Sequence, residues 1–206
     1  MPGVYISLGA ANYLNSAYAN AEAAWRKSLS LDSNQPTVLS NLGTMYFFEG
    51  RFVEAAAMYS KPRVLHPEDQ AIWGALGDAY RFIDGKEAES NAAYDTAIRL
   101  AELEYEVNSK NIEITSALAR IYATRNHTEK SERFIKLALE IGQEEMYVWY
   151  EVSLAYLALG QNQAAIEAVE RLLEMGYPVN VLANDAMFSA LAENSRFRKL
   201  VNSPDD

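Results

Sequence analysis

Apolar and small residues recur at helical spacing between positions 73 and 80 of the chain. Spacings of three and four residues place them on one face of a helix: Trp73, Leu76, Gly77 and Tyr80. A helix with such a face buries it against a neighbouring element. The segment therefore predicts an amphipathic helix packed on one side.

The same pattern recurs along the chain. Its leucine position is occupied in turn by Leu8, Leu42, Leu76, Leu118 and Val152. Three of the steps are 34 residues long, and the step from Leu76 to Leu118 is 42. A period in this range is typical of stacked supersecondary units. The pattern predicts an all-α solenoid of about five helix-turn-helix repeats.

The spacing also predicts where the repeats begin and end. We expect one domain over residues 1–206, with repeats at about 2–35, 36–69, 70–111, 112–145 and 146–179. Apolar residues continue beyond the last repeat, at Met187, Phe188, Leu191, Phe197, Leu200 and Val201. An array of repeats needs its open end closed. We therefore expect capping helices at about 182–202 that fold back over the last repeat.

Prolines and glycines mark the helix boundaries. Pro36 suits the first turn of a helix, where its missing N–H group is not needed. Gly50 suits the left-handed position that closes a helix. Pro62, in contrast, lies inside a predicted helix and would remove a hydrogen bond at a cost of about 3 kcal/mol. We expect a kink or an early helix end at Pro62.

The third repeat is eight residues longer than the others. One additional residue fits the turn 84–86, and the other seven fit a second helix that continues to about Val107. Seven residues are nearly two helical turns, about 10.5 Å, so the extension keeps the buried face in register. Either Ser109 or Asn111 can then cap the next helix.

The composition limits the kinds of partner and reaction to be expected of the chain. The net charge is −10 and no dense run of Lys or Arg is present, which argues against nucleic acid as a partner. The chain has no Cys, and no apolar run reaches the roughly 18–20 residues of a membrane span. Its histidines, His66 and His127, lie at a helix stop and in a turn, far apart in the array. We expect no enzymatic activity, no cofactor, no bound metal and no insertion into a membrane.

The repeats resemble the tetratricopeptide repeat family over about residues 2–179. The second repeat matches the family's pattern at Leu39, Leu42, Gly43, Tyr46, Ala55, Tyr59 and Pro67, and departs from it at Pro62. The resemblance implies a right-handed superhelix whose inner wall is formed by the first helix of each repeat. It also implies a protein or peptide as the partner. The family's clamp for terminal carboxylates is not expected, because its basic positions are Ile6, Ala71 and Ala75 here.

A narrower resemblance involves three segments: 73–81, 97–102, and 176–178 continued through Asp185 to 195–197. These look like the C-terminal repeat regions of bacterial signalling proteins, in which a winged-helix DNA-binding domain, a Ser/Thr kinase or an adenylate cyclase precedes the repeats. The resemblance implies a sensory or docking region, either in the periplasm as part of an inner-membrane protein or in the cytoplasm. No such effector domain is present in this sequence.

The register places candidate binding residues on the inner wall. Aromatic anchors and single polar groups suit an extended or helical peptide. The candidates for partner binding are Asn41, Thr44, Phe48, Asp78, Arg81, Arg120, Tyr150 and Glu151, and the same wall includes Phe47, Phe82, Glu113, Ser116 and Tyr147. Asn41 is favoured for holding a peptide backbone, because a side-chain amide offers both a donor and an acceptor.

Alternatives stay open for several wall residues. The rings of Phe47, Phe48 and Phe82 can instead wedge between adjacent helices, and Asp78 and Arg81 can pair with each other or with Arg120. Three functions also stay open for the chain. The first is a protein-interaction module. The second is a scaffold whose exposed end repeats form a homodimer, and the third is the substrate-recognition arm of a transferase.

Overall fold

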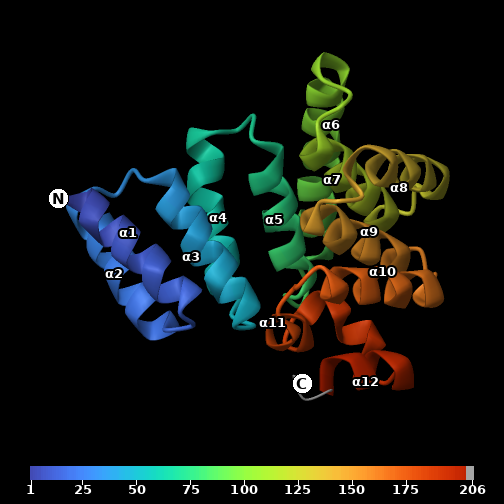
Figure 1. Cartoon of the computed structure of the whole chain (residues 1–206). Helices are drawn as coiled ribbons and strands as arrows, with labels where there is room; N and C mark the ends of the chain where they lie inside the picture. Colours follow the sequence, from blue (N-terminus) through green and yellow to red (C-terminus); the bar gives the residue numbers. More distant parts are fainter. Residues whose placement is uncertain (203–206) are drawn as a thin grey trace. The chain divides into compact units, whose positions relative to one another are not determined.

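The computed structural model describes residues 1–202, and every regular element in this range is a helix. Figure 1 shows the helices as successive hairpins followed by shorter C-terminal elements. They are α1 (Pro2–Leu14), α2 (Tyr18–Leu31), α3 (Pro36–Phe48), α4 (Phe52–Leu65), α5 (Gln70–Arg81), α6 (Glu87–Val107), α7 (Ile112–Thr124), α8 (Thr128–Gly142), α9 (Met146–Ala158), α10 (Asn162–Glu174), α11 (Val179–Ala183), the 3-10 helix η1 (Ala186–Leu191) and α12 (Ser195–Asn202). The predicted class, all-α repeats with C-terminal capping helices, is confirmed.

The chain divides into two compact units, residues 1–97 and 98–206, with the boundary inside α6. Unit 1 contains the hairpins α1–α2 and α3–α4, together with α5 and the first part of α6. Unit 2 contains the remainder of α6, the hairpins α7–α8 and α9–α10, and the capping helices. The organisation as a single domain of five repeats stays a prediction.

In unit 1, a glycine of α3 faces a tyrosine ring of α4, and a glycine of α5 faces a tyrosine ring of α6. A Cβ atom at Gly43 would lie 2.6 Å from Cε1 of Tyr59, and one at Gly77 would lie 2.7 Å from Cδ1 of Tyr94. Neither approach leaves room for a methyl group in a close-packed interior. The glycine of the repeat pattern is thus required by the packing of the hairpin.

The turns between paired helices share one backbone feature. Each contains a residue with a φ angle between 57° and 74°: Ser16, Gly50, Gly85, Asn126 and Gly160. In the second hairpin, the N–H of Arg51 donates to the carbonyl of Tyr46 at 2.8 Å. This bond uses a carbonyl that the end of the helix leaves free. The expected closure of α3 at Gly50 is confirmed.

Pro62 does not end its helix early. Helix α4 continues through Pro62 to Leu65, and the proline ring is buried. The N–H of His66 donates to the carbonyl of Pro62 at 2.8 Å, so the last turn remains bonded. A proline this close to the C-terminal end costs one helical hydrogen bond, and the turn beyond it stays intact. The predicted early end of the helix at Pro62 was therefore wrong, and the predicted kink at Pro62 stays a prediction.

The longer third repeat lengthens α6, as expected. This helix has 21 residues and ends at Val107, whereas α4 has 14. In unit 2, its last turns contact the next repeat through Tyr105, whose ring centre lies 5.1 Å from that of Phe134. Asn111 then caps α7 by accepting a hydrogen bond from the N–H of Ile114 at 3.2 Å. Of the two expected caps, Asn111 is the one used.

The C-terminal elements of unit 2 close its last hairpin. Phe188 and Leu191 of η1 are buried, and so is Phe197 of α12. Arg196 of α12 makes two bonds to Glu170 of α10, at 2.7 and 2.6 Å. Contacts of η1 with α9 and of α12 with α10 complete the cover. The expected fold-back of this segment over the last repeat is confirmed.

Candidate partner-binding surface

The eight candidate residues lie on first helices of hairpins, in two different units. Unit 1 carries five of them on α3 and α5: Asn41, Thr44, Phe48, Asp78 and Arg81. Unit 2 carries Arg120 on α7, and Tyr150 and Glu151 on α9. Each unit therefore presents its own group of candidates.

Thr44 and Asp78 hold tyrosines of their own hairpins. Thr44 Oγ1 lies 3.0 Å from the hydroxyl oxygen of Tyr59, and the hydroxyl of Tyr94 donates to Asp78 Oδ1 at 2.6 Å. These are the rings that lie against Gly43 and Gly77. Both candidates thus help to fix how the second helix packs on the first.

Phe48 and Arg81 border an aromatic cluster between α3, α4 and α5. Phe47 is buried in its centre, with ring centres 5.3–6.0 Å from those of Phe48, Phe52 and Phe82. Phe52 and Phe82 stack at 4.6 Å. The guanidinium of Arg81 lies 6.0 Å from the ring centre of Phe82. These rings form the wedge between helices that was the alternative to a partner contact.

Asn41 differs from Thr44 on the same helix. Its side chain is half-buried, and no hydrogen bond joins it to another residue in the described range 1–202. The amide keeps a donor and an acceptor for another molecule. Within unit 1, Asn41 and the exposed Arg81 are thus the candidates whose polar groups make no hydrogen bond within residues 1–202, and Asn41 is the one that offers both a donor and an acceptor.

Arg120 and Glu151 form a buried ion pair between α7 and α9. Arg120 Nε lies 2.7 Å from Glu151 Oε2, and the two side chains are only 9% and 7% exposed. Charged groups withdrawn from water to this degree depend on each other for compensation. The pair joins two successive repeats, so it stabilises the packing of α7 against α9 in unit 2.

Tyr150 connects α9 to the cap. Its hydroxyl donates to Asp185 Oδ2 at 2.7 Å, and Asp185 Oδ1 accepts from the N–H of Met187 at 2.9 Å. The rings of Tyr177 and Phe188 lie with centres 5.9 Å from that of Tyr150. Burial and the charge of Asp185 raise the pKa of Tyr150, which keeps its hydroxyl a donor. Tyr150 thus anchors η1 to the last repeat.

Tyr147 was expected on the inner wall from the sequence, but it was not chosen as a candidate for partner binding. It lies in the first turn of α9 and is 45% exposed, next to the fully buried Val148. An exposed aromatic ring on a packed helix is a common anchor for a partner. Spacing alone cannot distinguish it from Tyr150, because whether a wall tyrosine is covered depends on the cap.

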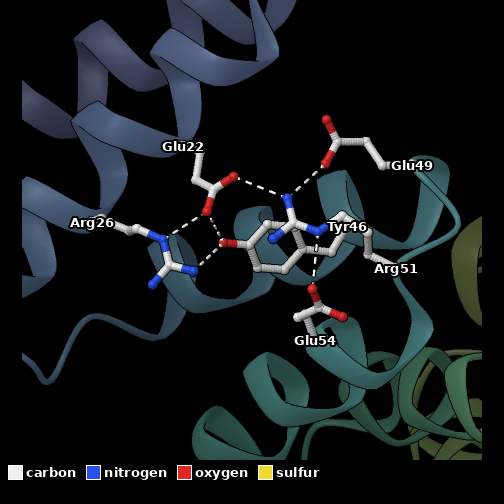
Figure 2. Close-up of polar contacts among 6 residues, drawn as sticks. All are labelled: Glu22, Arg26, Tyr46, Glu49, Arg51 and Glu54. Carbon is white, nitrogen blue, oxygen red and sulfur yellow. Dashed lines mark hydrogen bonds and ion pairs between the residues drawn. The ribbon is translucent and has the colours of Figure 1, made fainter.

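A polar cluster in unit 1 was not anticipated from the sequence. Figure 2 shows its members: Glu22, Arg26, Tyr46, Glu49, Arg51 and Glu54. The hydroxyl of Tyr46 donates to Glu22 Oε1 at 2.7 Å and accepts from Arg26 at 2.8 Å. Arg51 donates to Glu22 Oε2 at 3.0 Å and lies 4.1 Å from the centre of the Tyr46 ring. The cluster joins α2 to α3 and to the start of α4.

A similar cluster of a tyrosine, an acidic and a basic side chain occurs in unit 2. The hydroxyl of Tyr122 donates to Glu102 Oε1 of α6, and Lys130 donates to the same oxygen at 3.1 Å. The amino group of Lys130 lies 4.7 Å from the centre of the Tyr122 ring. Tyr46 and Tyr122 share one position of the repeat pattern. Such a cluster could therefore be recognised in a sequence by three residues. They are a tyrosine at this position of the repeat pattern, an acidic residue on the second helix of the preceding repeat, and a basic residue near the start of the second helix of the same repeat.

The cluster in Figure 2 makes the stability of unit 1 depend on pH. Partial burial alone would raise the pKa of Glu22, but hydrogen bonds from Tyr46, Arg26 and Arg51 outweigh it and lower the pKa to about 2. A lowered pKa contributes stability that is complete above the unfolded value and is lost as pH falls through the folded one. We expect Glu22→Gln to flatten the loss of stability between about pH 5 and pH 2.

Urea titrations of the wild type and Glu22→Gln across this range measure the effect. Glu174→Gln, which alters an exposed acid of α10, is the control, and it should leave the acid dependence unchanged. Parallel acid dependence in the wild type and Glu22→Gln would contradict the role given to Glu22.

The described residues offer little reactive chemistry. Within residues 1–202, no three His, Cys, Asp or Glu side chains lie together in a way that could hold a metal ion. His66 is half-exposed, with Nδ1 3.5 Å from Glu68, and His127 precedes α8 in an exposed turn. Over the same range, no helix has the combined length and apolar character needed to cross a membrane.

This architecture is also found in known proteins. The model of the tetratricopeptide repeat family matches residues 147–175, and no curated protein matches the chain. Among solved structures, a thermophilic TPR protein from Thermus thermophilus has 17% identity and a TM-score of 0.65, covering 93% of this chain and 100% of that one. A tetratricopeptide repeat protein from Parabacteroides merdae has 19% identity and a TM-score of 0.62, with 97% and 75% covered.

A third solved structure is YrrB, described as a TPR protein with an unusual peptide-binding site. It has 17% identity and a TM-score of 0.50, covering 92% of this chain and 90% of that one. At these identities the likeness concerns the fold, while the family match concerns one repeat. The chain therefore contains a tetratricopeptide repeat at residues 147–175 and has the fold of tetratricopeptide-repeat proteins.

Proposed function

We propose that the chain is a non-catalytic protein-interaction module, and that the first helices of unit 1 bind a peptide segment of a partner protein. The tetratricopeptide-repeat fold supports the general role, because stacked hairpins present long surfaces for binding. YrrB, a protein of the same fold, is described as having a peptide-binding site. The shared fold does not identify which residues bind the peptide.

The uncommitted amide of Asn41 carries the proposal. A peptide backbone presents an N–H donor and a C=O acceptor at every residue but proline, and one asparagine side chain can meet both. Thr44 and Asp78 hold tyrosines of their own hairpins, whereas Asn41 has no such bond within residues 1–202. Phe48 lies one helical turn beyond Thr44 and is half-exposed, so it supplies an apolar contact on the same helix.

Selection from a phage-displayed library of short random peptides tests this role. Peptides that bind the wild type are labelled, and their affinities are measured by fluorescence anisotropy. Asn41→Ala should raise the Kd about tenfold, which corresponds to the loss of about 1.4 kcal/mol of hydrogen bonding. Asn20→Ala is the matched control, because Asn20 is an exposed asparagine on the second helix α2.

Circular dichroism should show the same helix content in both variants. Equal affinity of the wild type and Asn41→Ala for every selected peptide would refute the assignment of the site. An equal loss in Asn20→Ala would show that the effect does not depend on this surface.

We further propose that the chain is a sensory or docking region of a bacterial signalling protein. The support is the sequence resemblance of the 73–81 segment, the long second helix α6 and the ending that leads into η1 and α12. The coding sequence beside the gene segment for these residues is the test. A winged-helix, kinase or cyclase domain would support this context, and a transferase domain would favour a substrate-recognition arm instead.

A further inference from the structure

Helix α1 exposes two positions that are buried in every later repeat. Val4 corresponds by the repeat spacing to Val38, Ile72, Ile114 and Val148, and Leu8 corresponds to Leu42, Leu76, Leu118 and Val152. All of these counterparts are at most 7% exposed, whereas Val4 is 63% and Leu8 is 48% exposed. In α3 and α9 this face packs against the preceding hairpin. The exposed face of α1 is thus the stacking face of a repeat.

The composition of this face suits contact with an identical surface. Helix α1 contains no charged residue, although the chain has a net charge of −10. Exposed Ser7 and Ala11 are small and alternate with Val4 and Leu8. Small positions let two helices approach closely, and the larger ones fill the space beside them. Two copies can meet here without bringing like charges of α1 together.

We propose that two copies of the chain form a dimer through their α1 helices, related by a two-fold axis. An antiparallel crossing with the axis between Ser7 and Leu8 sets Leu8 of each copy over Ser7 of the other. It also sets Val4 over Ala11 and joins the exposed ends at Met1 and Leu14. Each contact repeats on both sides of the axis, as an isologous interface requires. Helix α1 has 13 residues, so the contact extends over about 20 Å.

The other end of the chain favours this arrangement over head-to-tail stacking. In unit 2, α12 and η1 pack over the last hairpin, and Ile166 and Leu172 of α10 are buried. A second copy cannot place its α1 on α10 without displacing this cap. A two-fold contact between α1 helices leaves the cap in place and continues the packing that the repeats already use.

Sedimentation equilibrium of the 206-residue chain tests the dimer. The wild type should form dimers at micromolar concentration. Leu8→Glu places two carboxylates beside the axis, so the dimer Kd should rise by about a hundredfold or more. Leu103→Glu is the matched control, because Leu103 of α6 is 52% exposed and lies outside α1. It should leave the Kd unchanged.

Cross-linking locates the axis independently. The chain has no cysteine, so Ser7→Cys introduces its sole thiol. Two such thiols beside a close two-fold crossing are within reach of a disulfide, and mild oxidation should give a covalent dimer. Leu103→Cys should stay mostly monomeric. A wild type that is monomeric throughout, a dimer that survives Leu8→Glu, or equal cross-linking of both cysteine variants would overturn the proposal.

Discussion

Replacing Glu151 by alanine should lower the free energy of unfolding by about 3–5 kcal/mol, because it removes a carboxylate that contacts the buried guanidinium of Arg120 directly. The bond between Arg120 Nε and Glu151 Oε2 is 2.7 Å long, and both side chains are almost fully shielded from water. The pair also joins α7 to α9, so the loss should affect the packing between two successive repeats.

A double replacement distinguishes the cost of leaving a buried charge uncompensated from the cost of disturbing the packing between α7 and α9. Arg120→Met combined with Glu151→Leu removes both charges and should recover most of the stability, since apolar replacement of a buried pair is often near neutral. Urea denaturation followed by circular dichroism measures all variants. Glu174→Ala is the control at the exposed pair with Arg171, and it should cost less than about 1 kcal/mol. Similar losses for Glu151→Ala and Glu174→Ala would contradict the importance of burial.

Gly77→Ala should destabilise the chain by about 1–3 kcal/mol, the usual cost of overpacking a core. The new methyl group would lie 2.7 Å from Cδ1 of Tyr94, a ring that is buried and bonded to Asp78. The ring can move only by breaking that bond or by separating α5 from α6. Thermal and urea unfolding should therefore shift in the same direction.

Gly3→Ala provides the matched control for this glycine. Gly3 lies in α1, and an added Cβ there meets no atom within 4 Å. Alanine favours a helix over glycine by about 0.5–1 kcal/mol, so this variant should be neutral or more stable. Gly77→Ala together with Tyr94→Leu should lose less than the sum of the two single changes, because the overlapping ring is gone. A fully additive result, or a stable Gly77→Ala variant, would contradict the close approach.

The helices and the succession of hairpins could be predicted from the amino-acid sequence alone. The leucine positions from Leu42 to Val152 indicated the period, Pro36 and Gly50 marked helix boundaries that the structure has, and Asn111 was one of two expected caps for α7. These features depend on interactions within one or two helical turns, so local spacing contains the information. Pro62 was the exception, because a proline near the end of a helix costs too little to stop it.

The sequence could not show which wall residues form contacts within the fold, because those contacts depend on the tertiary packing. Thr44 bonds a tyrosine 15 residues away, Arg120 an acid 31 residues away, and Tyr150 an aspartate 35 residues away in the cap. A repeat pattern gives the face on which a side chain lies, but not the atom that it meets across a neighbouring helix. Packing at long sequence separation sets those contacts, and it leaves Asn41 and the face of α1 available to other molecules.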